Sequence, residues 1–462
     1  MKLTLRRLIK LWGEPCNFTE AKLDKFLGEI CTDTRRLKKG DFFLPLIGKY
    51  FDGHNFIDKA YSLGAQATII ERNSDVLVPH DLLFWFVDDT LKAFHELSLL
   101  YRQVLDIPVV AITGSAGKTT TRQMISSTLK SLGPVKESQG NNNNEIGVPL
   151  TITGANKSHK VIVVEMGMRG LGEIARLSDC SNPDIAVITN IGSAHIGLLG
   201  SRENIANAKC EITYNLKRDG VVIIPAGDEL LDRVLKKSWN GRVVRVGLYN
   251  ELSKIKNIYS NYKRKVNILG TYSNVDQTIC IDSYTYKLPI EGIHNANNFL
   301  LSIAVARELG VDNKSLNNIN INIYPGRNRI LKIKNITILD ETYNASPESI
   351  FACLNLLVSK PGRHFAVLGR MLELGEKSIE MHQKVIDESI ALGIDGLIFL
   401  IDDIQLLNKL RIPENIKNFF IISNKEEVKN LILKLIQDGD VVLLKASRKI
   451  GLEYLIPFLC DI

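Results

Sequence analysis

In the first hundred residues, apolar positions occur in short runs that are separated by turns. The runs at residues 41–47, 67–70 and 82–87 predict strands. Residues 57–63 and 90–105 instead repeat their apolar positions at a spacing of three or four, which predicts helices. Strands and helices in this mixture indicate a small mixed α/β domain, which we place at residues 1–105.

The next two hundred residues follow a different rhythm. Near-continuous apolar runs at residues 109–112, 161–165, 185–189 and 221–224 alternate with helical or loop sequence. Runs of this kind are typical of parallel strands that are covered on both faces. A helix is predicted over residues 297–309. This region therefore forms a doubly wound central domain, which we place at residues 106–312.

The rhythm restarts after about residue 313. Apolar runs at residues 336–339, 365–368, 397–401, 419–422 and 441–444 predict strands that alternate with helices. This pattern indicates a second, Rossmann-like α/β domain at residues 313–462. The predicted fold class is therefore α/β, with three domains.

Composition and charge narrow the range of functions. The 462 residues include 45% hydrophobic and 24% charged residues, which is normal for a globular protein. The net charge of +7 suits an enzyme that handles acidic, phosphorylated substrates. No basic domain or stripe predicts nucleic-acid binding, and we interpret the run Lys263-Arg264-Lys265 as a solvated strand or loop face.

The cysteines and the N-terminal residues bear on the cellular compartment. Seven cysteines are scattered without a Cys-x-x-Cys pair, which favours free thiols in a reducing cytosol. The basic start of the chain lacks the continuous apolar segment of a signal peptide. No stretch reaches the roughly 18 apolar residues of a membrane helix. We expect a cytoplasmic protein without membrane insertion.

A candidate phosphate loop follows the first strand of the central domain. Gly114-x-x-Gly117-Lys118-Thr119 lies between a buried strand and an amphipathic helix that runs to about residue 132. In this context backbone N–H groups and the helix N-terminus surround phosphates, Lys118 reaches the β- and γ-phosphates, and the Thr119 hydroxyl binds Mg²⁺. Ile112 occupies the position of the first Walker glycine, so a strand-to-helix turn without nucleotide is the alternative.

Three further side chains follow strands or helices of the same domain. Glu165 ends one strand, His195 follows another, and Lys209 lies in a helical segment. Since ligands collect at the carboxyl ends of parallel strands, we expect Glu165 and His195 to converge on the phosphate loop. A carboxylate is a natural Mg²⁺ ligand there. Taken singly, Glu165 is also compatible with a loop cap, His195 with a structural role and Lys209 with an exposed helix position.

The motifs together resemble the Mur ligases, which are ATP-dependent amide-forming enzymes of peptidoglycan synthesis. The matching segments, in the order of that family, are Thr113-Gly114-x-x-Gly117-Lys118-Thr119-Thr120, Glu165-Met166-Gly167, Asn190-Ile191-Gly192-x-Ala194-His195, Ala208-Lys209-x-Glu211, Gly292-x-His294-Asn295-x-x-Asn298 and Gly326-Arg327.

The resemblance implies roles for particular residues. ATP would contact Gly114, Ser115, Ala116, Gly117, Lys118, Thr119, Thr120, His294, Asn295, Asn298, Arg327 and Asp340. Thr119 and Glu165 would hold one Mg²⁺, and His195 and Lys209, the latter as a carbamate, would hold a second. Lys118, Lys209, His195 and Glu165 would form the catalytic set.

Other segments resemble the family members that add D-alanyl-D-alanine to a UDP-N-acetylmuramoyl tripeptide. They are Gly140-Asn141-x-Asn143-Asn144-Glu145-Ile146-Gly147, Asp340-Glu341-x-Tyr343-Asn344-Ala345-x-Pro347, Leu368-Gly369-x-Met371-x-Glu373-Leu374-Gly375 with His382, and Asp33-Thr34-Arg35 with Asp52-Gly53-His54. The implied substrate-binding residues are Thr34, Arg35, Asn143, Asn144, Tyr343, Asn344 and Ala345. The chain departs from the family pattern at Cys210, Glu341, Ser346, Arg370 and Ala446.

Three alternatives remain open at this point. A sibling ligase that adds diaminopimelate or lysine shares the ATP motifs, although its Asp-Asn-Pro-Arg segment has no counterpart near residues 340–450. A folate polyglutamate ligase lacks the UDP-type N-terminal domain. A P-loop switch that binds nucleotide without ligation does not need Glu165, His195 and Lys209. We expect the protein to act as a monomer.

Overall fold

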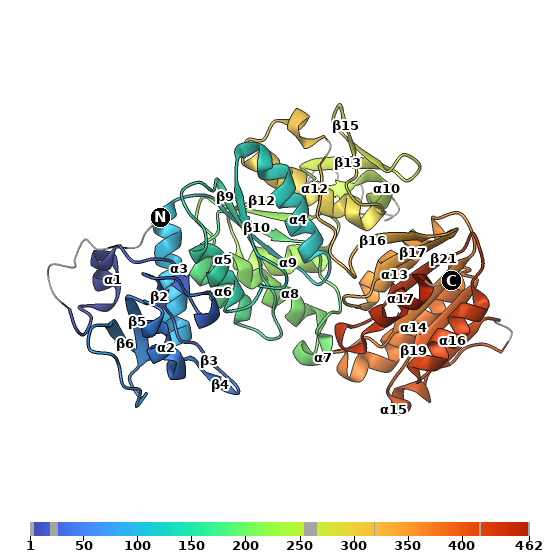
Figure 1. Ribbon diagram of the computed structural model, residues 1–462. Coiled ribbons are helices and arrows are strands. Elements are labelled where there is room, and N and C mark those ends of the chain that lie inside the picture. The colour runs from blue at the N-terminus through green and yellow to red at the C-terminus, as the bar shows by residue number, and fades with distance from the viewer. Residues whose placement is uncertain (1–3, 19–25, 254–265, 318, 415–416, 461–462) are drawn as a thin grey trace.

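In the computed structural model of the protein, residues 4–18, 26–253, 266–317, 319–414 and 417–460 are described. They form three α/β units that follow one another along the chain, from the N-terminal unit through a central unit to the C-terminal unit (Figure 1). The predicted three-domain α/β fold class is thus confirmed. The basic run Lys263–Lys265 lies outside the described residues.

The N-terminal unit is a small parallel sheet with a hairpin beside it. Its strand order is β1-β2-β5-β6, and β3 pairs with β4 in antiparallel fashion. The elements are β1 (Ile30–Cys31), β2 (Phe42–Phe43), β3 (Ile47–Gly48), β4 (Phe51–Asp52), β5 (Ala67–Glu71) and β6 (Leu83–Val87), with helices α1 (Leu5–Trp12), α2 (Ile57–Ser62) and α3 (Thr90–Leu105). The strands predicted at residues 67–70 and 82–87 and the helices predicted at residues 57–63 and 90–105 are present with small differences in their bounds. The run at residues 41–47 instead forms only the short strand β2 and, in the separate hairpin, the first residue of β3.

The central unit is a nine-stranded sheet of order β15-β14-β13-β12-β11-β10-β7-β9-β8. Its strands are β7 (Val109–Thr113), β8 (Val135–Glu137), β9 (Val161–Glu165), β10 (Ile185–Ile188), β11 (Val221–Pro225), β12 (Arg242–Leu248), β13 (Ile268–Ser273), β14 (Thr278–Ile281) and β15 (Tyr284–Lys287). Its helices are α4 (Lys118–Thr128), α5 (Gly147–Thr153), α6 (Glu173–Ser181), α7 (Ile196–Leu199), α8 (Arg202–Cys210), α9 (Glu229–Ser238), α10 (Tyr249–Leu252) and α12 (Ile293–Glu308).

The parallel core of this sheet is buried on both faces, which explains its continuous apolar runs. In β7, Val109 and Ala111 belong to a core shared with α5, α6, α8 and α9, whereas Val110 and Ile112 belong to a core shared with α4 and α12. All four side chains are fully buried. Two covered faces leave the carboxyl ends of the strands as the place where polar groups can gather.

Two features of the central unit differ from the sequence-based prediction. Strands β14 and β15 pair in antiparallel fashion and extend the sheet, although the apolar runs predict only parallel strands. These short strands alternate buried and exposed positions, as half-covered edge strands do. Helix α12 begins at Ile293, four residues before the predicted start. The apolar pattern misses this first turn because it contains the polar residues His294 and Asn295.

The C-terminal unit is a six-stranded sheet of order β16-β17-β21-β18-β19-β20, in which only β16 is antiparallel to its neighbour. Its strands are β16 (Arg329–Ile333), β17 (Ile336–Glu341), β18 (His364–Gly369), β19 (Gly396–Leu400), β20 (Phe419–Ile422) and β21 (Val441–Lys445). Its helices are α13 (Pro347–Val358), α14 (Ser378–Ala391), α15 (Ile404–Leu407), α16 (Lys425–Leu435) and α17 (Leu455–Cys460).

Helix α3 joins the N-terminal unit to the central one. It packs against α5 and α6, and its Arg102 is buried beside Asp184, with 2.6 Å between the guanidinium and the carboxylate. Asp184 also accepts a hydrogen bond from the backbone N–H of Val109, at the start of β7. The connection therefore anchors the first strand of the central sheet. No helix in the described part of the chain is both long and apolar enough to cross a membrane.

Candidate active site

The phosphate loop connects β7 to α4 and is held against the loop that follows β10. The backbone N–H groups of Ser115 and Ala116 donate to the backbone and side-chain oxygens of Asn190, at 3.1 and 3.0 Å. Gly114 has a φ of +151°, and a Cβ there would lie 1.8 Å from the Thr189 hydroxyl. Only glycine fits so close a contact. The loop is therefore fixed by the neighbouring strand end.

Oxygen ligands suited to a divalent cation adjoin this loop. The Thr119 hydroxyl donates to one carboxylate oxygen of Glu165 at 2.9 Å, and the Asn143 side-chain amide donates to the other at 2.9 Å. Arg122 is fully buried, with its Nε 3.6 Å from Glu165. These contacts hold the Glu165 carboxylate beside the start of α4. A hydroxyl and a carboxylate form the protein share of a typical Mg²⁺ site, in which phosphates and water supply the rest.

A half-buried lysine, Lys118, and a buried one, Lys209, lie at this site. Lys118 donates from its ammonium to the backbone oxygen of Gly114 at 2.8 Å. Lys209, on α8, is only 2% exposed, and no described residue forms a hydrogen bond or ion pair with its Nζ. Burial, followed by the positive charge of Lys118, lowers the pKa of Lys209 well below its ordinary value. A buried lysine without a counter-ion favours the neutral amine, which is the form that reacts with CO₂.

His195 lies between these lysines and the C-terminal unit. Burial and the charge of Lys118 lower the pKa of His195, and Glu373 opposes that shift. Its Nδ1 lies 2.5 Å from a carboxylate oxygen of Glu373. The structure thus brings Lys118, Thr119, Glu165, His195 and Lys209 to one end of the central sheet. In the described ranges no three His, Cys, Asp or Glu side chains cluster as a metal site.

The first turn of α12 adjoins the phosphate loop from the other side. Asn298 lies so close to Gly117 that a Cβ there would be 2.8 Å from its side-chain oxygen. Asn295 donates to the side-chain oxygen of Asn328 at 3.0 Å, and Asn328 donates to the Thr120 hydroxyl at 3.0 Å. Burial lowers the pKa of His294 to about 4. The predicted His294, Asn295 and Asn298 therefore lie where the central and C-terminal units meet.

Arg327 and Asp340 occupy the edge of the C-terminal unit that faces this site. The Arg327 guanidinium stacks 3.8 Å from the centre of the Tyr343 ring, and its charge helps to lower the pKa of Lys118, after burial. Asp340 is fully buried, and its carboxylate accepts from the backbone N–H of Gly326 and the Thr342 hydroxyl. Asp340 therefore shapes the turn that carries Arg327.

Two of the family departures in the C-terminal unit have local partners. Arg370 forms ion pairs with Asp402 and Asp403, each at 2.9 Å, so two carboxylates neutralise the positive charge of the arginine at this position. Ser346 caps α13 and exchanges hydrogen bonds with Ser349 in a capping box. Both substitutions are thus accommodated by neighbouring side chains.

Two further departures lie near the predicted Tyr343, Asn344 and Ala345. Glu341 accepts from the backbone N–H of Asn328, and its carboxylate lies 3.8 Å from the Lys445 ammonium. Lys445 also donates to the backbone oxygen of Asn344 at 3.0 Å. Ala446 packs against Gly369, where a Cβ would lie 2.6 Å from its own. Burial raises the pKa of Glu341, and Lys445 opposes that shift.

The remaining predicted substrate residues lie elsewhere. Thr34 is buried and Arg35 is exposed beside Asp33 in the N-terminal unit, where the Arg35 guanidinium and the Asp33 carboxylate lie 2.7 Å apart. Asn144 accepts from the backbone N–H of Gly147 at 2.9 Å and so helps to begin α5. The structure does not bring these residues into the group around Lys118.

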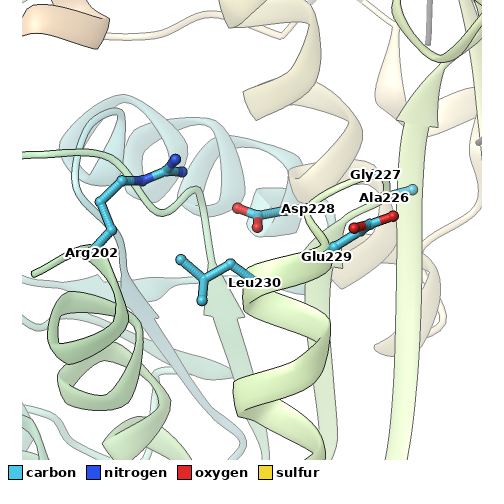
Figure 2. A pocket seen from close by; sticks show the side chains of 6 residues that line it. All are labelled: Arg202, Ala226, Gly227, Asp228, Glu229 and Leu230. Atoms are coloured by element: carbon cyan, nitrogen blue, oxygen red, sulfur yellow. The ribbon is translucent and has the colours of Figure 1, made fainter. Parts of the chain in front are cut away.

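A hollow of about 500 Å³ lies at the carboxyl end of β11. Figure 2 shows its lining side chains, among them Arg202 from α8 and Asp228 and Leu230 from the start of α9. Arg202 donates to the backbone oxygen of Ile191, and Asp228 caps α9 through the N–H of Leu231. Both charged groups therefore already stabilise the loops at this end of the sheet.

Sequence reasoning missed several residues of the site. Glu373 and Glu348 reach the loop after β10 from the C-terminal unit, and Asn328 links Thr120 to Asn295. Glu373 stands inside a quoted motif, yet nothing local in the sequence indicates that its partner is His195. Arg122 lacks any such signal, because a charged residue in a predicted amphipathic helix is expected at its surface, whereas almost every residue of α4 is buried.

His382, beneath the Met371 segment, gives a pH prediction. Its Nδ1 donates to the backbone oxygen of Ser378 and its Nε2 accepts from the N–H of Met371. Burial lowers the pKa of His382 from 6.5 to about 4. Since the unfolded chain takes up this proton first, the free energy of unfolding is expected to fall as the pH drops from 6.5 towards 4.

Thermal unfolding measured between pH 7.5 and 4.5 tests this expectation. As the pH is lowered, the melting temperature of His382→Gln should decrease less steeply than that of the unmodified protein. His80→Gln, which changes an almost fully exposed histidine, serves as the control and should keep the original slope. Equal slopes for all three proteins would contradict the prediction.

Comparison with known proteins identifies the family. The Mur ligase middle domain matches residues 112–306, the Mur ligase glutamate ligase domain matches residues 326–448, and the Mur ligase family catalytic domain matches residues 28–105. A curated relative from Synechocystis, named UDP-N-acetylmuramoyl-tripeptide--D-alanyl-D-alanine ligase, is 37% identical over 96% of this chain and 95% of its own length. The chain belongs to the Mur ligase family.

Solved structures agree with this assignment. MurF from Acinetobacter baumannii superposes on this Mur ligase with a TM-score of 0.86 and 27% identity, over 100% of this chain and 99% of that one. MurF from Thermotoga maritima, solved in complex with ADP, gives a TM-score of 0.78 and 29% identity, over 94% of this chain and 97% of that one. The predicted resemblance to the Mur ligases is therefore confirmed.

Proposed function

We propose that this Mur ligase joins D-alanyl-D-alanine to a UDP-N-acetylmuramoyl tripeptide at the expense of ATP, which yields a pentapeptide precursor of peptidoglycan. The observation that carries the proposal is the convergence of the phosphate loop, Glu165, His195 and Lys209 on one sheet end, in a chain with full-length relatives of that name. The reaction consumes ATP, a carboxylic acid and an amine, and releases ADP, phosphate and an amide.

The three units divide this task. Residues 1–105 bind the UDP part of the substrate, with Thr34 and Arg35 near the diphosphate. Residues 106–312 bind ATP, and residues 313–462 close over it and bind the dipeptide. Hydrogen bonds between the last two units, such as that from Asn328 to Thr120, support closure. We further propose that the protein is a cytoplasmic monomer.

The residues present fit two magnesium ions. Thr119 and Glu165 would hold one through their adjoining oxygens. His195 and a carbamate on Lys209 would hold the other, since carbamylation turns a buried neutral amine into an anionic oxygen ligand. Bound Mg²⁺ neutralises charge on the phosphoryl group during transfer.

The chemistry begins at the carboxyl end of the tripeptide. A carboxylate oxygen attacks the γ-phosphorus of ATP, the bond to the bridging oxygen breaks, and ADP leaves. The resulting acyl phosphate has a good leaving group, which the carboxylate lacks. The free amine of the dipeptide then attacks the carbonyl carbon, the amine loses a proton, and phosphate departs from the tetrahedral intermediate.

The protein contributes position and charge. Lys118, held by the Gly114 carbonyl, offsets negative charge on the β- and γ-phosphates. Arg327 stacks on the Tyr343 ring and adds positive charge from the C-terminal unit. This charge is in place only when the C-terminal unit is docked on the central one. His195 would hold a metal ion rather than move a proton. Orientation of this kind is worth several orders of magnitude in rate.

The rival functions make different predictions. A sibling ligase that adds diaminopimelate or lysine would accept a single amino acid as the amine, and a nucleotide switch would need neither substrate. The segment Tyr343-Asn344-Ala345, held by Lys445, favours the dipeptide reaction over the sibling one. The buried Lys209 beside Lys118 favours ligation over a switch, because a switch does not need a second lysine at this site.

Phosphate release from ATP, with the product followed by mass spectrometry, tests the proposed function. Release should require both the UDP-muramoyl tripeptide and D-alanyl-D-alanine, and the product should gain the mass of the dipeptide. The same assay with the third residue of the tripeptide as lysine or as diaminopimelate identifies the natural acceptor. Turnover with a single amino acid in place of the dipeptide, or without any muramoyl substrate, would refute the proposal.

A further inference from the structure

The loop between β10 and α8 receives two carboxylates from the C-terminal unit. Glu348, in the first turn of α13, accepts a hydrogen bond from the backbone N–H of Ser193 at 2.6 Å. Glu373, which precedes α14, lies 2.5 Å from Nδ1 of His195. Ser193 and Glu348 are 155 residues apart in the chain, and His195 and Glu373 are 178 residues apart. The histidine therefore sits in a loop that the C-terminal unit holds at two points.

Glu373 is held by its backbone as well as by its side chain. Its carbonyl oxygen accepts from the N–H of Gly197 at 2.9 Å, and its second carboxylate oxygen lies 3.7 Å from Nε of Arg169. A Cβ on Gly197 would lie only 2.4 Å from the backbone nitrogen of Gly375. The backbones of the two units thus touch beside His195, which fixes the position of the Glu373 backbone next to the histidine.

Both partners adopt an uncommon backbone conformation. His195 has a φ of +67° and Glu373 a φ of +63°, in the left-handed region that residues with a Cβ rarely occupy. Such conformations persist where the surroundings impose them, and they gather at functional sites. Here each conformation aims a side chain across the boundary between the two units, at the other.

The pairing determines which ring nitrogen of His195 is free. An ionised carboxylate is only an acceptor, so Nδ1 must carry the proton that it donates. The lone pair of a neutral ring is then on Nε2, for which no described residue provides a hydrogen bond. A histidine that binds metal through one nitrogen commonly donates from the other to a carboxylate, which fixes the ring orientation and its tautomer.

We propose that Glu373 is a positioning residue that sets the orientation and tautomer of His195, so that the second metal site is complete only when the C-terminal unit is docked. This inference rests on the proposed function and on the metal role of His195. It gives the dipeptide-binding segment a second task. The segment that receives the incoming amine also prepares the site that activates the carboxyl group, which links the arrival of the C-terminal unit to phosphoryl transfer.

Binding of Mn²⁺, used as a paramagnetic substitute for Mg²⁺, tests this directly. Electron paramagnetic resonance titration of the full-length protein with ADP and the UDP-muramoyl tripeptide should give two bound Mn²⁺. Glu373→Ala should weaken the second by about 10- to 100-fold, as loss of a partner of a metal-bound histidine does, and leave the first unchanged. Glu373→Gln retains an oxygen acceptor for Nδ1, so it should restore most of the affinity.

Three further measurements separate positioning from a general structural effect. Glu376→Ala changes an exposed carboxylate three residues away and should bind both Mn²⁺ like the unmodified protein. The effects of His195→Ala and Glu373→Ala should not add in the double variant, because they remove the same site. In turnover assays Glu373→Ala should lower kcat with little change in the KM for ATP.

The outcomes distinguish this proposal from the proposed function. If the unmodified protein ligates the dipeptide, and Glu373→Ala or, should that variant not fold, Glu373→Leu, which also lacks an acceptor for Nδ1, binds two Mn²⁺ with unchanged affinity while His195→Ala loses one, the positioning role is refuted and the ligase function stands. Additive losses in the double variant would refute it as well. If the unmodified protein shows no substrate-dependent turnover, the proposed function itself fails.

Discussion

Lys209→Ala is expected to lower kcat by about a hundredfold or more. The substitution removes the carbamate that we propose as a metal ligand. The loss is large because charge stabilisation by a metal ion is worth several kcal/mol, and each ~1.4 kcal/mol of activation free energy changes the rate tenfold. Lys209 is buried beside Lys118 and has no partner among the described residues, so the loss does not break an ion pair. Phosphate release with both substrates measures the effect.

The same variant offers a chemical rescue. Alanine leaves a cavity in which a short carboxylic acid, such as acetate or propionate, can bind and supply the missing anionic oxygen. Activity should therefore rise with the concentration of the acid. Lys209→Met fills that space with an apolar chain and should be inactive without rescue. Lys236→Ala, on the exposed side of the neighbouring helix α9, should keep full activity. A fully active Lys209→Ala would refute the carbamate.

Gly197→Val is expected to lower kcat by about a hundredfold, through the docking of the C-terminal unit. A side chain at this position meets the backbone of Gly375, Leu374 and Glu373, at 2.4 to 2.8 Å from the Cβ, and backbone cannot move aside as a flexible side chain can. The C-terminal unit would then seat wrongly, and a displacement of about 1 Å at a reacting centre costs on the order of a hundredfold in rate.

Scattering and binding measurements identify the cause. With an ATP analogue and the muramoyl tripeptide, the unmodified protein should become more compact, whereas Gly197→Val should not. Binding of the UDP substrate, which we assign to the N-terminal unit, should be unchanged. Gly170→Ala, in another loop of the central unit, meets only the flexible end of Glu173 at 3.4 Å and is the control. Normal turnover and compaction in Gly197→Val would contradict the prediction.

The parallel strands of the central sheet and the phosphate-loop motif were predictable because their signals are local. Continuous apolar runs indicate strands that are buried on both faces, and Gly114 to Thr119 between a strand and a helix indicates a phosphate loop. The rule that ligands gather at the carboxyl ends of parallel strands then predicts that Glu165 and His195 lie near that loop. The Thr119–Glu165 hydrogen bond has the geometry that this reasoning anticipates.

Other features depend on contacts that no local pattern encodes. Glu373 and Glu348 act across the boundary between two units, so their partners become apparent only once the units are docked. Strands β14 and β15 are short and half-covered, which leaves them without a long apolar run. Asp340 matches a motif that implies contact with ATP, and the sequence does not indicate that its buried carboxylate also accepts hydrogen bonds from Gly326 and Thr342.

The central claim is that the terminal phosphate of ATP and two magnesium ions meet between Lys118, Glu165, His195 and Lys209. A crystal structure with Mg²⁺, a non-hydrolysable ATP analogue and the muramoyl tripeptide tests it most directly. One ion should contact Thr119 and Glu165 and the other His195 and a carbamylated Lys209, with oxygen contacts of roughly 2.1 Å. A triphosphate bound elsewhere, with these side chains remote from its γ-phosphate and an unmodified Lys209, would contradict it.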